Sequence, residues 1–112
     1  MILLRNMSKL NIQWATEAQE KWRETASYIR REWGVNALRK FKEKTEECQD
    51  QLEDFSALGK IEPLLVGRNT LYRSLVLTEQ NKIIYYVEEN IIYIVDIWDT
   101  RREPKAQANK VK

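Results

Sequence analysis

Two groups of basic residues are the part of this sequence that could most readily do chemistry. The first group lies within or beside runs of β-branched and aromatic residues in the second half of the chain, and it comprises Arg68, Arg73, Lys82, Arg101 and Arg102. A charged side chain in such a run needs a partner or an exposed groove. Guanidinium groups stabilise a phosphate well but are poor bases, because their pKa stays above about 12. Lys82 is therefore the residue of this group that could act as a general base, if its surroundings lowered its pKa.

The tyrosines of the same region leave two interpretations of these cations open. Tyr72, Tyr85, Tyr86 and Tyr93 alternate with them along the chain, so the region could combine phosphate clamps with base-stacking rings. Alternatively, the cations protect strand edges and form ion pairs with Asp96 and Asp99. The residues alone favour neither interpretation.

The second basic group lies in the first half of the chain and comprises Arg30, Arg31, Arg39, Lys40 and Lys42. It could contact phosphate, with Arg39 and Lys40 as the central pair. An ordinary solvated helix face with i,i+4 pairs such as Arg39–Glu43 is the interpretation that we favour. The charges of this segment also oppose the dipole of the helix predicted there.

Several kinds of site are excluded by composition. The chain has 112 residues, a formal net charge of only +2, no histidine and a single cysteine, Cys48. Imidazole chemistry is therefore impossible, an internal disulfide cannot form, and neither a metal nor another cofactor is expected. Cys48 falls on the apolar stripe of a predicted helix, which indicates a core residue.

Three runs predict antiparallel strands at Leu71–Thr78, Lys82–Glu88 and Ile91–Thr100, because the gaps between them are too short for a crossover helix. The last run is apolar on both faces, which predicts a strand inside the sheet. Strict alternation would place Trp98 on the same face as Ile92 and Ile94, and Ile97 on the other.

The first half predicts a short half-buried edge strand at 10–14 and then a helical hairpin, with helices at Thr16–Trp33 and Asn36–Phe55. Thr16 and Gln19 match a capping box, Gly34 suits a helix stop, and Asn36 suits the next helix cap. The fold class is α+β: a short strand and an αα-hairpin packed on a mainly antiparallel sheet.

We expect a single domain at residues 1–104, with residues 1–8 a possible extension before a start at Met7. The connection 56–70 has an apolar cluster that could form a short edge strand, and residues 105–112 are predicted to be a disordered tail. The apolar run Ile2–Leu4 is too short for a signal peptide or a membrane span, so a cytoplasmic protein is expected.

The order of these elements, with the pattern YR…KIIYYV…IYIVDIWDTRREP, resembles the RelE/ParE superfamily of bacterial toxins. The most specific part is the ending Asp99-Thr-Arg101-Arg102-Glu-Pro104. The resemblance covers about Leu10 to Pro104. It implies a growth-arresting toxin of a type II toxin–antitoxin module, with a cognate antitoxin as partner.

Two targets follow from the resemblance, because RelE-like members cleave mRNA on the ribosome whereas ParE-like members poison DNA gyrase. In the first case Arg73, Lys82 and Arg101 match basic catalytic positions of the family. Leu75 and Gln107 stand where those ribonucleases have a second strand lysine and a tail tyrosine. A catalytically inactive member that only binds its antitoxin is the alternative.

The implied contacts to nucleic acid or target would involve Arg68, Tyr85, Tyr86, Arg102, Arg39 and Lys40. We also expect an apolar groove for the antitoxin on the sheet or the hairpin. Finally, charge on the sheet is expected to matter more for toxicity than charge on the hairpin.

Overall fold

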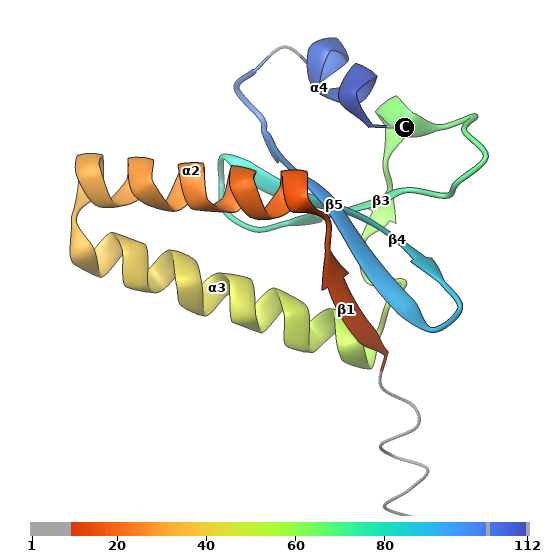
Figure 1. Ribbon diagram of the computed structural model, residues 1–112, viewed down its shortest axis with the longest axis horizontal. Coiled ribbons are helices and arrows are strands. Elements are labelled where there is room, and N and C mark those ends of the chain that lie inside the picture. Colours follow the sequence, from red (N-terminus) through yellow and green to blue (C-terminus); the bar gives the residue numbers. More distant parts are fainter. Residues whose placement is uncertain (1–9, 103, 112) are drawn as a thin grey trace, which may run out of the picture.

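A helical hairpin and a five-stranded sheet form the two main layers of the protein (Figure 1). The computed structural model describes residues 10–102 and 104–111. The strand order is β1-β5-β4-β3-β2, in which β1 runs parallel to β5 and every other neighbouring pair is antiparallel. The predicted α+β class and the predicted edge position of the first strand are confirmed.

The hairpin consists of α2 (Thr16–Trp33) and α3 (Val35–Asp54). Their apolar stripes cover one face of the sheet, so that Ala18, Phe41 and Leu52 share a buried core with Ile83 and Ile92. This confirms that the three- and four-residue spacing of apolar positions marks the buried side of each helix. Cys48 is 1% exposed in this core, as predicted.

The predicted helix stop at Gly34 is confirmed, but the predicted N-terminal caps of both helices are wrong. Ala15 is the N-cap of α2, and its side chain makes no capping hydrogen bond. The Gln19 amide instead donates to the backbone oxygen of Trp14 at 3.0 Å. Gly34 ends α2 and is also the N-cap of α3, which places Asn36 inside α3. A single residue with φ of 94° is thus enough to reverse the chain.

The sheet is built from β1 (Asn11–Trp14), β2 (Lys60–Ile61), β3 (Arg73–Val76), β4 (Asn81–Glu88) and β5 (Ile91–Asp99). The three antiparallel strands of the second half are confirmed, and the short β2 lies within the connection where an edge strand was considered possible. Glu89 and Asn90 both have positive φ, which is the geometry of a tight hairpin turn.

A bulge in β5 corrects the predicted faces of that strand. Ile84 pairs with Asp96 but Tyr85 pairs with Ile94, so Val95 is an extra residue. After the bulge the alternation is inverted. Ile97 therefore joins Ile92 in the core under the hairpin, whereas Trp98 packs on the opposite face.

The opposite face of the sheet is partly covered by a C-terminal helix, α4 (Pro104–Lys110), where the sequence predicted a disordered tail. Pro104 begins this helix, which is compatible with proline because the first helical N–H has no intrahelical partner. Ala108 and Val111 are buried against Tyr72, Ile84 and Trp98. The 3₁₀ turn η1 (Pro63–Leu65) adds Leu65 to this second core. Two small apolar side chains were too weak a periodic signal to reveal α4.

No helix within 10–102 or 104–111 is long and apolar enough to cross a membrane.

Candidate functional site

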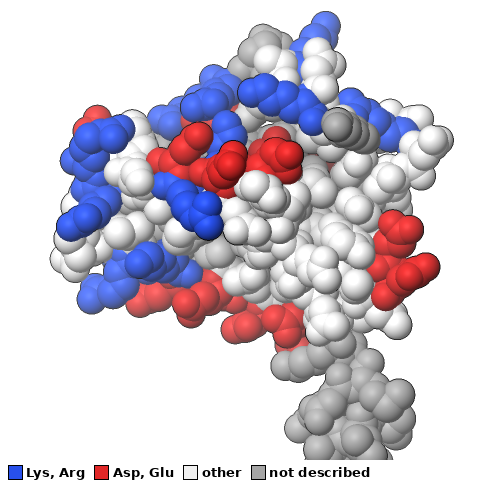
Figure 2. Space-filling view, in the orientation of Figure 1, with Lys and Arg blue, Asp and Glu red and all other residues white. Residues whose placement is uncertain are grey.

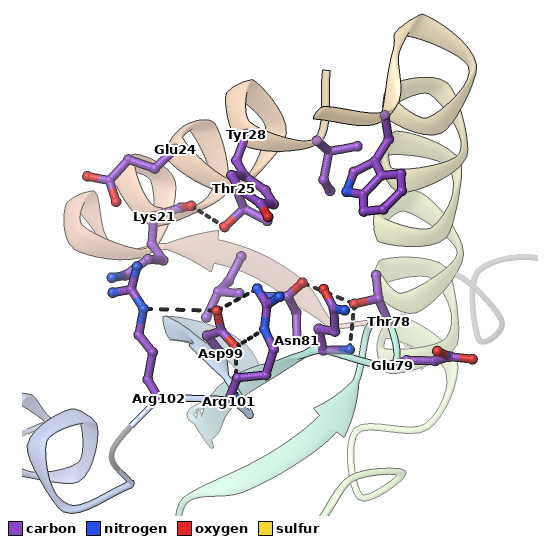
Figure 3. A pocket seen from close by; sticks show the side chains of 14 residues that line it. Lys21, Glu24, Thr25, Tyr28, Thr78, Glu79, Asn81, Asp99, Arg101 and Arg102 are labelled. Carbon is purple, nitrogen blue, oxygen red and sulfur yellow. Dashed lines mark hydrogen bonds and ion pairs between the residues drawn. The ribbon is translucent and has the colours of Figure 1, made fainter. Parts of the chain in front are cut away.

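One cavity lies where the end of β5 approaches the second half of α2 (Figure 3). Its volume is about 430 Å³. The β3–β4 turn contributes Thr78, Glu79, Gln80 and Asn81, and α2 contributes Tyr28 and Trp33 among others. Arg101 and Arg102 lie at the same cavity, beside the carboxylate of Asp99.

Asp99 positions the two arginines that follow β5. Its Oδ1 accepts from the Arg101 backbone N–H at 2.9 Å and from Nε at 3.1 Å, while Oδ2 accepts from Nη2 at 3.0 Å. Arg102 Nε lies 3.9 Å from the same Oδ2. The hydrogen bond from the Arg101 side chain is the main reason that the pKa of Asp99 is lowered. The arrangement presents two exposed cations at one rim of the cavity, held by one carboxylate.

Arg73, by contrast, serves the connection between α3 and β3. Its Nη1 donates to the backbone oxygen of Gly59 at 2.8 Å. Arg73 is paired in register with Tyr85, whose side chain belongs to the core under the hairpin. Paired residues of antiparallel strands point to the same side. Arg73 therefore lies on the hairpin side of the sheet.

Lys82 lies on the other side. It is paired with Trp98, and its Nζ lies 5.2 Å from the centre of the Trp98 ring. The same Nζ lies 2.5 Å from Oε1 of Glu62, a side chain that is only 1% exposed. Burial alone would raise the pKa of Glu62, but hydrogen bonds from Lys82 and from the Leu64 N–H outweigh it, and the pKa is lowered. Lys82 thus fixes the connection 60–65 onto the sheet.

The structure therefore does not bring Arg73, Lys82 and Arg101 together. Arg73 and Lys82 are on opposite faces, and each is bound to an acceptor within the chain. Arg101 alone of the three lies at the cavity described above.

The two tyrosines predicted to face a target differ from one another. Tyr85 is 0% exposed; its hydroxyl donates to the Ser56 oxygen at 2.7 Å and accepts from the Gly59 N–H at 2.8 Å. Burial raises the pKa of this hydroxyl. As a buried core residue it cannot stack on a base, which corrects the prediction. Tyr86 is half-buried on the other face, with its ring 5.0 Å from that of Tyr93.

Arg68 also has a partner within the chain, since its Nη2 donates to the Ala108 oxygen at 3.0 Å and its Nη1 to the Val111 oxygen. It satisfies carbonyls at the end of α4. Arg39 and Lys40 are exposed on α3, where Arg39 makes the predicted pair with Glu43 at 4.0 Å.

Three polar residues of structural importance were missed. Glu62 could have been found from its place before Pro63, because it caps η1. Gln107 has no sequence signal; its amide bonds both the N–H and the oxygen of Asp99. Asp96 had been considered only as an ion-pair partner, but it accepts hydrogen bonds from the Ile97 N–H and the Trp98 indole. Within residues 10–102 and 104–111, no group of three acidic or cysteine side chains could hold a metal ion.

The α+β arrangement described above matches that of solved ParE- and YoeB-type toxins. The model of a family described as "ParE toxin of type II toxin-antitoxin system, parDE" matches residues 12–104. The chain belongs to this family, and it is the toxin component of a type II toxin–antitoxin system. No curated protein matches it in sequence.

Solved structures share its fold. The chromosomal ParDE toxin–antitoxin system from P. aeruginosa gives a TM-score of 0.66 at 16% identity, covering 84% of this chain and 99% of the other. The YoeB dimer from Staphylococcus aureus gives a TM-score of 0.54 at 24% identity, covering 79% of this chain and 93% of the other. The heterotetrameric YoeB–YefM toxin–antitoxin complex from the same organism gives a TM-score of 0.51 at 23% identity, and the same shares of the two chains are covered.

Proposed function

We propose that this toxin arrests growth by binding DNA gyrase in the cytoplasm, and that it inhibits gyrase without cleaving RNA or DNA itself. The observation that carries the proposal is the separation of Arg73 from Lys82 by the sheet, with each cation bound to an acceptor in its own chain. The match of residues 12–104 to the ParE family supports the same choice of target.

A metal-free ribonuclease would need a different arrangement. Attack by a 2′-hydroxyl requires a base, in-line geometry and cations around one pentavalent phosphate. Arg73 and Lys82 cannot reach one phosphate from opposite faces of the sheet. In addition, Leu75 and Gln107 are not groups that can transfer a proton. The ribosome-dependent endoribonuclease is therefore the weaker of the two mechanisms.

Purified gyrase and purified ribosomes distinguish the two mechanisms directly. The protein is added to gyrase with supercoiled plasmid and ATP, and in parallel to ribosomes programmed with a defined mRNA. We expect gyrase-dependent DNA breaks or loss of supercoiling, and intact mRNA. Cleavage of the mRNA with no effect on gyrase would refute the proposal. No effect in either assay, with retained antitoxin binding, would support the inactive alternative.

The role of Lys82 has its own matched pair of variants. Lys82→Met leaves Glu62 as a buried charge without its partner, and we expect loss of folded protein and of toxicity. The double variant Glu62→Gln, Lys82→Met removes both charges, and we expect it to fold and to arrest growth. A catalytic Lys82 would give the opposite result, a folded double variant that is not toxic.

We further propose that the partner of this toxin is a cognate antitoxin that covers apolar surface. The connection before β3 exposes a series of large apolar side chains: Leu58, Ile61, Leu64, Val66 and Leu71, which are 40–70% exposed. This surface lies on the connection, whereas the sequence led us to expect a groove on the sheet or hairpin.

Coexpression with the product of the adjacent gene should yield a complex in which the connection before β3 is protected from proteolysis. If no complex copurifies, the proposed partner is wrong.

A further inference from the structure

The end of the αα-hairpin carries a concentration of positive charge that the helix dipoles explain only in part. Arg30 and Arg31 lie in the last turn of α2, where the dipole favours cations, but Arg39, Lys40 and Lys42 have no such explanation. We call residues 30–42 the hairpin end. It contains five basic residues and one acidic residue, a net charge of +4 in a chain whose total is +2. Figure 1 shows this end extending well beyond the sheet, and Figure 2 shows basic side chains gathered there.

Few of these charges are neutralised by their surroundings. The ion pair between Arg39 and Glu43 has an N–O distance of 4.0 Å, and both side chains are about two-thirds exposed. Arg31 lies 5.8 Å from the centre of the Tyr28 ring, a cation–π contact, and it forms no ion pair with the residues that the structure describes. Within the described chain, Arg30, Lys40 and Lys42 are exposed and form no ion pair. An exposed ion pair such as Arg39–Glu43 contributes little to the stability of the fold.

The distribution of charge along α3 is also unfavourable for the helix. Its first turn contains no acidic residue and its last turn no basic residue, whereas Glu46, Glu47 and Asp50 lie in its second half. Because the N-terminal end of a helix is the positive end of its dipole, cations near that end destabilise it. The stability of the helix itself therefore does not account for the placement of these charges.

Two large apolar side chains are exposed beside these cations. Trp33 is 70% exposed and Val35 is 64% exposed, on either side of Gly34. Aromatic residues and arginine are the types most enriched where proteins meet their partners. The hairpin end therefore combines exposed cations with apolar surface where the hairpin extends beyond the sheet.

We propose that the hairpin end is a contact surface for the sugar-phosphate backbone of duplex DNA. The inference rests on the proposed function, since the DNA would be the duplex held by gyrase. Each helix is about 10–12 Å wide with its side chains, so two helices side by side are wider than the major groove of about 12 Å. The cations would therefore reach phosphates along the groove edges and not base edges. Several dispersed cations on a convex end suit a repeating row of phosphates better than a single acidic pocket on a protein.

Binding to a fluorescein-labelled duplex of random sequence, measured across a series of salt concentrations, tests this contact. The variant is Arg39→Glu with Lys40→Glu. The matched control is Arg23→Glu with Lys60→Glu, which changes the net charge equally at exposed positions away from the hairpin end. Each lost phosphate contact should reduce the slope of log affinity against log salt by about 0.9. We expect the hairpin variant to lower affinity at least tenfold and to reduce the slope by about two, and the control to retain the wild-type slope.

Trp33→Ala supplies an independent measurement. Trp33 is uncharged, so its loss should weaken binding severalfold while the slope stays the same. Equal effects of the hairpin variant and the control would overturn the proposal, because they would show attraction by overall charge alone. The hairpin variant could instead bind gyrase alone, in the absence of DNA, less tightly than wild type while it binds the duplex as tightly. That result would also overturn the proposal, and it would indicate an acidic protein surface as the partner.

The same measurements separate this proposal from the proposed function. If wild-type protein binds the duplex through the hairpin end but leaves gyrase unaffected, the choice of gyrase is wrong and the DNA contact stands. If it inhibits gyrase equally well with and without the hairpin substitutions, the DNA contact is wrong and the target stands.

Discussion

Gly59 lies at a point where three separate segments of the chain meet. Its N–H donates to the Tyr85 hydroxyl and its oxygen accepts from Arg73. A Cβ atom at this position would lie 2.6 Å from the Ser74 oxygen and 2.7 Å from the Tyr85 hydroxyl. Neither neighbour can move freely, because Ser74 is in the sheet and Tyr85 is fully buried.

Gly59→Ala should therefore lower the free energy of unfolding by about 1–3 kcal/mol, through overpacking. Tyr85→Phe should cost a similar amount, about 1–3 kcal/mol, because the Gly59 N–H loses its buried acceptor. The double variant should lose less unfolding free energy than the two single variants added together, since it lacks the Tyr85 hydroxyl with which the new Cβ atom would clash. Urea denaturation measures all three. Strict additivity would show that the hydroxyl does not limit the space at Gly59.

The pair formed by Glu62 and Lys82 predicts a dependence of stability on acid. The pKa of Glu62 is lowered by folding, so the carboxylate stabilises the folded state above its unfolded pKa of about 4.3. This contribution is lost as the pH falls through the lower folded pKa. We expect the difference in unfolding free energy between wild type and Glu62→Gln to be full near pH 6 and to shrink as the pH falls below about 4.3, towards the lower folded pKa.

Asp99, whose pKa is also lowered, contributes to the same acid sensitivity. It is unchanged in Glu62→Gln, so the difference between the two proteins isolates Glu62. A difference that stays constant from pH 6 to pH 3 would mean that the ion pair does not stabilise the fold.

At the scale of elements, α4 is attached to the sheet by side-chain hydrogen bonds as well as by its short apolar face. The Asp99 N–H donates to Gln107 Oε1 at 2.9 Å, and Gln107 Nε2 donates to the Asp99 oxygen at 3.0 Å. The amide of Gln107 thereby takes the place of a neighbouring strand at the edge of β5. Arg68 holds the other end of the helix.

Gln107→Ala should release α4, because both backbone groups of Asp99 lose their partner. We expect the local free energy of opening to fall by about 1–3 kcal/mol, measured as faster amide hydrogen exchange at residues 105–111. Gln107→Glu is the control that keeps an acceptor but loses the donor, and it should show an intermediate effect or a larger one through repulsion by Asp99. Unchanged exchange in both variants would assign the attachment to Arg68.

Regular periodicity made the hairpin and the three antiparallel strands predictable, because the spacing of residues such as Phe41 and Leu52 follows directly from burial of one helix face. Some features that depend on a single residue were not predictable. The bulge at Val95 leaves no composition signal, and Trp98 therefore lies on the face opposite to the predicted one. The N-cap of α2 is Ala15, which shows that a matching capping-box pattern does not ensure the capping bonds.

For the whole molecule, the candidate site was predictable only in part. The exposed arginines after β5 were recognised from their position and do lie at a cavity. Arg73 and Lys82 were chosen for the same reason, but which face a strand residue occupies depends on register, and their partners Gly59 and Glu62 come from an irregular connection. No local pattern reveals such partners.

Arg101 provides the test of function at this scale. Its side chain is about half exposed and is bound at its guanidinium fork by Asp99. We expect Arg101→Ala to abolish growth arrest and gyrase inhibition while the protein still folds and binds its antitoxin. Arg101→Lys should restore only part of the activity, because a point charge cannot reproduce the fork.

Circular dichroism and antitoxin copurification serve as the controls for folding. Full toxicity of the Arg73→Ala, Arg101→Ala double variant would exclude both arginines from target binding. It would leave the hairpin end as the remaining basic surface.

The parallel pairing of β1 with β5 has a consequence for the timing of synthesis. Asn11 pairs with Ile91, and all residues of the hairpin, β3 and β4 lie between them. The helices can form from local contacts while the chain is still being made, but β1 must wait for a partner 80 residues later. The nascent toxin therefore spends most of its elongation without a closed sheet. The proposed antitoxin would have that interval in which to meet a chain whose sheet is still incomplete.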